Sequence, residues 1–307
     1  MVIGRLKLKE KAYDFPPYRP PSEAYSLLLR VTRGCPWNKC LFCSMYKGIP
    51  FERRPLEEIK GDIETAAHLY QEVVTCVFIG DSNSLIVKTT LLLEILRSLN
   101  ASFPHLERIT SYARAKTVAK KDLDELRKLR QAGLVRLHVG LETGDAETLS
   151  FIKKGATPDE MIEGGLKVKE AGFELSLYIL LGIGGMKRWE EHAEGTIAVL
   201  NKIDPHFIRV RTLTPQPGSP LFAMSKRGAF MMSPPNIILE EERKIIEGLK
   251  VNSEFLSDHI SNYIPLNGKL PEDKSFLLQL LDQEIVHLRK DPGILEHYRQ
   301  KELLRHL

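Results

Sequence analysis

The chain has 307 residues, of which 43% are hydrophobic and 27% charged, and its formal net charge is +4. This is the composition of an ordinary soluble globular protein, and the mild positive charge does not by itself indicate a nucleic-acid partner. No apolar run approaches the ~20 residues of a membrane helix, and the first residues lack the apolar core of a secretory signal. We therefore expect neither a membrane protein nor a secreted one.

Residues 1–22 are polar and rich in proline, and we expect them to form an extended arm on the body of the protein. Beyond them, short apolar runs alternate with segments of helical periodicity. This alternation is typical of βα units around a parallel sheet. The predicted strands are 26–32, 74–79, 108–113, 135–141, 173–181 and 207–213, and the predicted helices include 56–70, 89–99, 145–151, 158–171 and 188–201.

Another helix is expected between the third and fourth strands, where Leu123, Leu126 and Leu129 share one face and Gly133 can end the helix. After Pro235 the periodicity becomes helical, over 238–256, 276–290 and 294–307. The sequence therefore predicts an α/β core over 23–220 and a mainly helical C-terminal extension over 221–307.

Three of the four cysteines lie in the loop that follows the first predicted strand. Cys35, Cys40 and Cys43 stand within nine residues of one another. Cys76 lies in an apolar strand, where we expect a buried small hydrophobic residue rather than a metal ligand. Clustered thiolates are soft ligands that suit zinc or an iron–sulfur cluster. Zinc would need a fourth ligand, which no neighbouring residue supplies. Disulfide pairing is the remaining alternative, but this cysteine usage favours a reducing, cytoplasmic location.

This loop resembles that of the radical S-adenosylmethionine (SAM) superfamily. Phe42 stands just before the last cysteine, and Arg33-Gly34 precedes the first. The usual spacing of the family is C-x3-C-x2-C, whereas this chain has C-x4-C-x2-C. The resemblance implies a partial (β/α)6 TIM-like barrel, a [4Fe-4S] cluster on the three cysteines with one iron left open, and SAM bound at that iron. The six predicted βα units agree with such a barrel.

Polar or glycine-rich segments follow every predicted strand, and in parallel barrels such segments meet at one mouth. By resemblance, Gly80 and Asp81 would meet the SAM amino group, although the same residues suit an ordinary turn. Arg114 would face SAM or substrate. Glu142, in the segment GLETG, would contact SAM, and Lys154 would pair with the SAM carboxylate. An exposed arginine or lysine is the alternative for Arg114 and Lys154.

The remaining candidates follow the later strands. Gly182 and Gly184 resemble the glycine segment that packs against adenine, with Phe42 near the same ring. Arg211 shares a strand face with Arg209 and is expected to reach SAM or substrate. The segment 258–263 is the densest polar group of the C-terminal part, and Asp258, His259 and Tyr263 are its candidates for proton or hydrogen-atom transfer. A helix-ending loop is the alternative.

The resemblance implies that SAM is reductively cleaved to methionine and a 5′-deoxyadenosyl radical, which takes hydrogen from a small-molecule or cofactor-precursor substrate. A flavodoxin or ferredoxin-type protein would donate the electron. Two alternatives remain open. One is an RNA-modifying enzyme, which the absence of a dense basic run with interleaved aromatics disfavours. The other is a non-catalytic iron–sulfur or SAM-binding carrier. The loop Gln216-Pro217-Gly218-Ser219-Pro220 resembles the one after the last core strand in the family's coproporphyrinogen-dehydrogenase-like and elongator-like branch.

Overall fold

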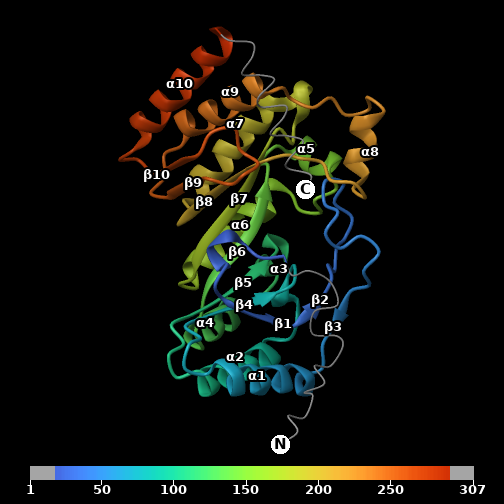
Figure 1. Ribbon diagram of the computed structural model, residues 1–307, viewed down its shortest axis with the longest axis vertical. Coiled ribbons are helices and arrows are strands. Elements are labelled where there is room, and N and C mark those ends of the chain that lie inside the picture. The colour runs from blue at the N-terminus through green and yellow to red at the C-terminus, as the bar shows by residue number, and fades with distance from the viewer. Residues whose placement is uncertain (1–17, 291–307) are drawn as a thin grey trace, which may run out of the picture.

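A sheet in which seven strands run parallel organises residues 18–290, the part of the chain described by the computed structural model (Figure 1). An eighth strand, β10, pairs antiparallel with β9 at one edge. The order across this sheet is β1 (Leu27–Arg30), β4 (Cys76–Gly80), β5 (Arg108–Ala113), β6 (Leu134–Glu142), β7 (Glu174–Leu181), β8 (Phe207–Thr212), β9 (Glu254–Ser257) and β10 (Leu266–Lys269). A small antiparallel pair, β2 (Thr32–Arg33) and β3 (Glu52–Arg53), flanks the cysteine loop.

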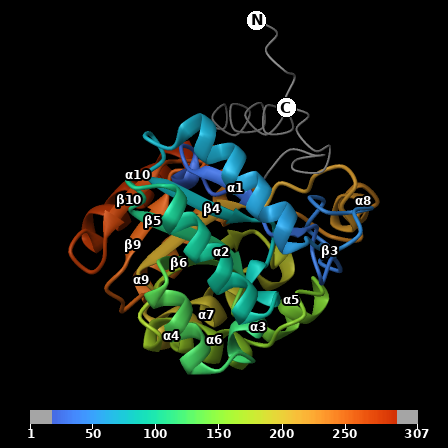
Figure 2. The ribbon, with the colours of Figure 1, turned by 90° about the horizontal axis from the view of Figure 1, so that it is seen from below.

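The helices cover the outside of this curved sheet (Figure 2). Along the outside, α1, α2, α4, α6, α7, α9 and α10 each contact the next in this order, as expected for a barrel wall that does not close. The helices are η1 (Pro21–Glu23), α1 (Leu56–Tyr70), η2 (Ser84–Ile86), α2 (Thr89–Ser102), α3 (Ala115–Ala119), α4 (Leu123–Gln131), α5 (Ala146–Phe151), α6 (Pro158–Glu170), α7 (Gly185–Ile203), α8 (Pro220–Lys226), α9 (Pro235–Gly248) and α10 (Lys274–Lys290). Within residues 18–290, no helix is both long and apolar enough to span a bilayer.

The six predicted strands and the partial α/β barrel are confirmed. Local chemistry explains several of the boundaries. Thr157 and Glu160 form a reciprocal capping box at the start of α6, with Pro158 in the first turn. Gly133, at a φ of 102°, follows the end of α4 as predicted.

The helix predicted over 238–256 is wrong in its second half. The helix α9 ends at Gly248, and the chain continues into β9, which pairs with β8. Every second side chain is buried here, including Val251, Ser253 and Phe255, and this period of two is typical of a strand. The predicted division at residue 220 stays a prediction, although the sheet itself continues beyond it. Residues 1–17 and the helix predicted over 294–307 lie outside the described residues.

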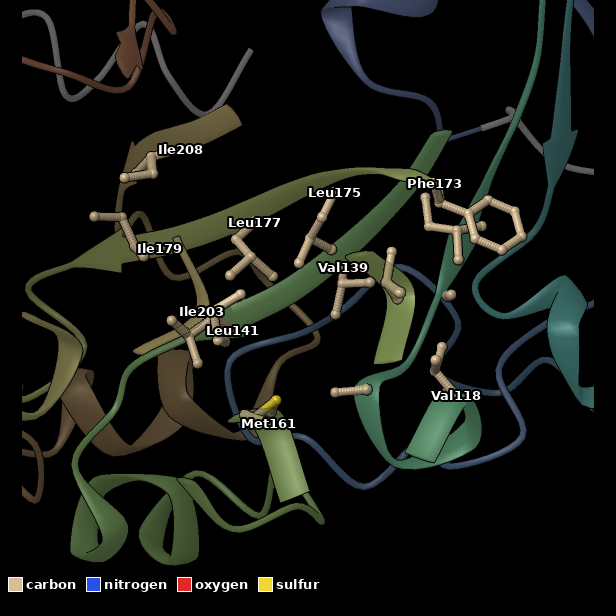
Figure 3. Close-up of a cluster of buried hydrophobic side chains, with 14 of the residues drawn as sticks. Val118, Val139, Leu141, Met161, Phe173, Leu175, Leu177, Ile179, Ile203 and Ile208 are labelled. Carbon is tan, nitrogen blue, oxygen red and sulfur yellow. The ribbon is translucent and has the colours of Figure 1, made fainter. Parts of the chain in front are cut away.

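Strand alternation divides the sheet into two chemically different faces. On the outer face, apolar side chains of β6 and β7 pack against Met161 of α6 and Ile203 of α7 (Figure 3). Leu175 and Leu177 belong to this outer layer and are almost completely buried. The intervening positions of the same strands turn toward the interior of the barrel, where the side chains are polar or aromatic. This inner face lines the cavity described next.

Candidate active site

A cavity of about 390 Å³ opens at the carboxyl ends of the parallel strands. Its wall combines the cysteine loop, the ends of β5 to β8 and the segment 259–261. In parallel α/β barrels this end carries the functional site, because the loops after the strands converge there. The predicted site residues that line the cavity are Cys35, Cys40, Phe42, Cys43, Arg114, Glu142, Lys154, Arg211 and His259.

The cysteine loop is held from both sides by distant parts of the chain. The Leu41 N–H donates to the carbonyl of Ile152 at 2.9 Å, and the Leu41 carbonyl accepts from the N–H of Leu221 at 2.8 Å. Within the loop, the Asn38 amide donates to the Tyr46 carbonyl at 2.6 Å. These bonds fix the path of the backbone on both sides of Cys40 without using the thiols.

The three thiols suit a cluster by their chemistry and position. All three are free and half-buried, and they lie together on the cavity wall. Burial raises the pKa of Cys40 and Cys43, and the charge of Lys154 counteracts this rise. A bound metal would supply the positive charge that stabilises the thiolates. Among the described residues, no three Cys, His, Asp or Glu side chains converge on one metal ion, but in a cubane each thiolate binds its own iron.

Asp81 supports the cysteine loop from behind. Its carboxylate accepts from the Gly34 N–H at 2.8 Å and from Arg30 Nε at 3.3 Å, and the residue is 3% exposed. Ser82 adds a bond from its hydroxyl to the Gly34 carbonyl at 3.1 Å. Asp81 does not line the cavity, so the geometry supports a role in positioning the loop rather than the predicted contact with the SAM amino group.

Glu142 and Lys154 form an ion pair on the cavity wall. Lys154 Nζ lies 2.6 Å from Glu142 Oε1, and both side chains are largely buried. Glu142 has a φ of 65°, at an irregularity in the pairing of β6 with β7. A non-glycine residue in this left-handed region is strained, and such strain is concentrated at functional sites. The side chain folds back over Gly140, where a Cβ would lie only 2.1 Å from Oε1.

Trp37, in the longer segment between the first two cysteines, connects the loop to Lys154. Its indole N–H donates to the Lys153 carbonyl at 2.7 Å, and its ring packs on Gly155. The guanidinium carbon of Arg114 lies 5.1 Å from the centre of the ring, and Arg114 also donates to the Lys154 carbonyl at 2.8 Å. The segment between the first two cysteines therefore contributes a side chain to the cavity wall.

Aromatic and imidazole rings form the deep part of the cavity. Tyr112 of β5, His138 of β6 and Tyr178 of β7 all line it, with ring centres about 6 Å apart across the strands. Burial raises the pKa of Tyr112 strongly and that of Tyr178 to about 12. Both phenols are therefore neutral, and each can donate one hydrogen bond.

Below this layer, Glu23 closes the bottom of the barrel from η1. Its carboxylate lies 3.3 Å from His138 Nε2 and accepts from the Ser26 hydroxyl at 2.6 Å, and Arg108 lies within 3.6 Å. Burial lowers the pKa of His138, so the ring is neutral and its Nε2–H donates to Glu23. His138 Nδ1 is consequently an acceptor, and it has no protein partner in the described part of the chain.

The segment 258–263 is attached to β8 at the cavity rim. Asn262 donates to the Val210 carbonyl at 3.0 Å and accepts from the Thr212 hydroxyl at 3.0 Å. The Ser261 N–H donates to His259 Nδ1 at 3.1 Å, so Nδ1 is the acceptor of this bond. His259 lines the cavity, but Asp258 and Tyr263 do not.

Two of the predicted glycines, Gly182 and Gly184, stand where the packing is tight, whereas nothing lies within 4 Å of a Cβ built at Gly80. Gly80, Gly182 and Gly184 do not line the cavity. A Cβ at Gly182 would lie 2.7 Å from Ile238, and one at Gly184 would lie 2.5 Å from the Arg188 carbonyl, so both allow close packing of the helices that follow. Sequence reasoning missed Trp37, Tyr112, His138 and Tyr178. The last three were detectable as polar residues at alternate positions of predicted strands.

The family profile described as the radical SAM superfamily matches residues 29–194. An uncharacterized methyltransferase of Pyrococcus horikoshii is 25% identical over 220 residues, which are 69% of this chain and 45% of that protein. Heme chaperone HemW of Bacillus subtilis is 22% identical over 73% of this chain and 60% of its own length. The chain thus spans about half the length of these relatives.

Solved structures show the same fold. Coproporphyrinogen III oxidase from Escherichia coli superposes with a TM-score of 0.54 at 17% identity, over 72% of this chain and 50% of that one. Methylornithine synthase superposes with a TM-score of 0.51 at 22% identity, over 74% of this chain and 63% of that one. At these identities the similarity establishes the architecture and not a shared substrate.

Proposed function

The chain belongs to the radical SAM superfamily, whose cofactors are a [4Fe-4S] cluster and SAM, and we propose that it acts as an enzyme on a small-molecule or cofactor-precursor substrate held in the cavity. When bound, these cofactors supply the reductive cleavage of SAM to methionine and a 5′-deoxyadenosyl radical. The observation that carries the proposal is the arrangement of three half-buried thiols and a buried Glu142–Lys154 pair on the wall of one cavity.

Each part of this wall has a definite task. Cys35, Cys40 and Cys43 hold the cluster as thiolates. Lys154 offers a cation to the carboxylate of SAM, and Glu142 offers an acceptor to one of its donors. These two side chains lie 2.6 Å apart, so together they would present one cation and one anion to the amino-acid part of SAM. Phe42, 5.8 Å from Lys154 Nζ, provides an apolar surface beside them.

The surrounding residues orient the substrate and exclude water. Tyr112 and Tyr178 are neutral donors at depth, and His138 is a neutral acceptor. His259 lies at the rim of the cavity and is the candidate for moving a proton during the reaction. Reductive cleavage of SAM consumes an electron, and a flavodoxin or ferredoxin-type protein is the proposed donor.

A non-catalytic carrier is the second candidate function. The observation that favours it is the similarity to a protein named as a heme chaperone, which covers 73% of this chain. A carrier would bind SAM or heme without producing 5′-deoxyadenosine, so one assay separates the two functions.

The test begins with anaerobic purification and reconstitution with iron and sulfide. We expect about four irons per chain, an electron paramagnetic resonance spectrum that changes when SAM is added, and 5′-deoxyadenosine after reduction. The triple variant Cys35→Ala, Cys40→Ala, Cys43→Ala loses the iron, whereas the matched control Cys76→Ala retains it. Heme binding with no 5′-deoxyadenosine under strong reductant identifies a carrier. A spectrum that does not change when SAM is added contradicts the enzymatic function, and it contradicts both functions if heme does not bind either.

A further inference from the structure

Two arginines of β8 face the interior of the barrel without a carboxylate partner among the described residues. Arg209 and Arg211 flank Val210, which is 1% exposed and packs outward, so both guanidinium groups belong to the inner face. Arg211 lines the cavity, and its guanidinium carbon lies 5.3 Å from the centre of the Tyr178 ring. Arg209 is the register partner of Tyr178.

Polar atoms next to these arginines are also left without protein partners. Arg209 Nε and the Tyr178 hydroxyl are both buried, and neither has a hydrogen-bond partner in the described part of the chain. The two arginines are close enough to Tyr178 to counteract the rise in its pKa that burial causes. A buried donor without an acceptor is costly, and native sites of this kind are completed by a ligand or by water.

The other cations of the cavity are already engaged. Lys154 pairs with Glu142 at 2.6 Å, Lys116 pairs with Glu160 at 2.8 Å, and Arg114 donates to a backbone carbonyl. Arg211 is therefore the positive charge of this wall that has no partner within the described residues. An arginine in this situation matches a carboxylate or a phosphate, which it can bind through two parallel hydrogen bonds.

SAM cannot supply this anion if its carboxylate binds Lys154, because SAM carries a single anionic group. Lys154 follows α5, whereas Arg211 lies on β8, so the two cations reach the cavity from different elements. The second anion must then come from the other molecule in the cavity, which under the proposed function is the substrate.

We infer that Arg211, with Arg209 and Tyr178 beside it, binds a carboxylate or phosphate group of the substrate. The surrounding wall is formed by Tyr112, Leu180, Leu213 and their neighbours, so the rest of the substrate is apolar or aromatic. This inference rests on the proposed function for the identity of the bound molecule as substrate, and it assigns Arg211 to the substrate rather than to SAM.

The test uses calorimetric titration of the anaerobically reconstituted protein in the presence of SAM. The probes are benzoate, phenyl phosphate and the neutral isostere benzamide. We expect one of the two anions to bind at least tenfold more tightly than benzamide, and which one binds separates a carboxylate from a phosphate substrate. Equal binding of benzoate, phenyl phosphate and benzamide, or no binding of either anion, would overturn the inference.

Three variants locate the site. Arg211→Met is expected to weaken binding of the preferred anion at least tenfold, and Arg211→Lys to retain part of the affinity. Arg227→Met removes an exposed arginine of the α8 end and serves as the matched charge control, with unchanged binding. Far-UV circular dichroism checks the fold of each. If Arg211→Met binds the anion as wild type does, or if it weakens SAM binding equally, the inference is wrong.

The same preparations separate this inference from the proposed function. Arg211→Met is expected to retain its iron and to bind SAM as wild type does. If wild type makes no 5′-deoxyadenosine but still binds benzoate or phenyl phosphate through Arg211, the proposed function fails and the anion site stands. If 5′-deoxyadenosine forms while neither anion binds, the proposed function stands and the anion site fails.

Discussion

Gly140 and Glu142 of β6 depend on each other: the Glu142 carboxylate occupies the space in which a side chain at residue 140 would stand. A Cβ there would lie 2.1 Å from Glu142 Oε1 and 2.8 Å from Lys154 Nζ. The segment GLE therefore keeps its glycine so that the glutamate can fold back onto Lys154. No backbone constraint is involved, since Gly140 does not have a positive φ.

Replacing Gly140 by alanine tests this relationship. Gly140→Ala should push Glu142 off Lys154 and cost about 1–3 kcal/mol of unfolding free energy, as overpacking of a filled site does. SAM affinity, measured by calorimetry on the reconstituted protein, should fall about tenfold. Gly61→Ala is the control, because nothing lies within 4 Å of a Cβ there and the helix α1 should gain up to about 1 kcal/mol. Wild-type SAM affinity in Gly140→Ala would refute the dependence.

The contact of Trp37 with Gly155 can be tested with a second glycine pair. Gly155 and Gly48 both have positive φ, 73° and 77°, so alanine costs about 1 kcal/mol or more at either position. Only at Gly155 would the new methyl group also strike Trp37, at 2.3 Å. We expect Gly155→Ala to lower SAM affinity several-fold, while Gly48→Ala lowers only the melting temperature. Equal SAM affinity in both variants would show that the Trp37 contact does not position Lys154.

Stability should depend on pH through His138. Burial lowers the pKa of His138 below its ordinary 6.5, so the unfolded chain takes up a proton near pH 6.5 and the folded chain does not. The unfolding free energy is therefore expected to fall as the pH drops below about 6.5. In His138→Gln the part of this fall in unfolding free energy that comes from His138 should be absent. Urea unfolding at a series of pH values measures it. His105→Gln, at an exposed ion pair, is the control and should follow wild type.

Glu23 extends this dependence to lower pH. Burial raises its pKa, but hydrogen bonds from His138 and Ser26 and the charge of Arg108 outweigh burial, and the pKa lies below the ordinary 4.5. A carboxylate with a lowered pKa stabilises the fold above pH 4.5, and this contribution is lost as the pH falls through its folded value. Glu23→Gln should therefore be less stable than wild type at pH 7 and approach it in acid. A stability difference that does not change with pH would contradict this account.

Asn262 should anchor the rim segment. It bonds the Val210 carbonyl and the hydroxyls of Thr212 and Ser257, and it is 8% exposed. Asn262→Ala leaves these buried groups without their partner and should cost about 3 kcal/mol of unfolding free energy, measured in urea. Asn267→Ala, at an exposed side chain bonded to Asp258, should change stability by less than about 0.5 kcal/mol. Similar losses in the two variants would exclude an anchoring role.

The barrel was predictable because its signals are local. Hydrophobic periodicity, Pro158 and the three close cysteines each act within a few residues of sequence, and α1 was predicted over the residues that the structure shows. The strand β9 was missed because the alternation at Val251 to Ser257 follows α9 directly, so one helical segment seemed to continue. Its burial depends on pairing with β8, which no local signal records.

The cavity wall was predictable in part. Glu142, Lys154 and Arg211 line it as their positions after strands suggested. The contacts of the site residues were not predictable, because they depend on which distant segments the fold brings together. Asp81, for example, bonds Arg30 and Gly34, which stand more than forty positions earlier in the chain. Glu23 was predicted neither in the N-terminal arm nor among the site residues. It nevertheless contacts His138, which lies 115 positions later in the chain.

The two backbone bonds of Leu41 set an order of events during synthesis. They join the cysteine loop to Ile152 and Leu221, so a nascent chain that has not yet emerged past Leu221 lacks one of the two bonds that hold this loop. We therefore expect the three cysteines to reach their final positions only once the segment around Leu221 has folded onto the loop.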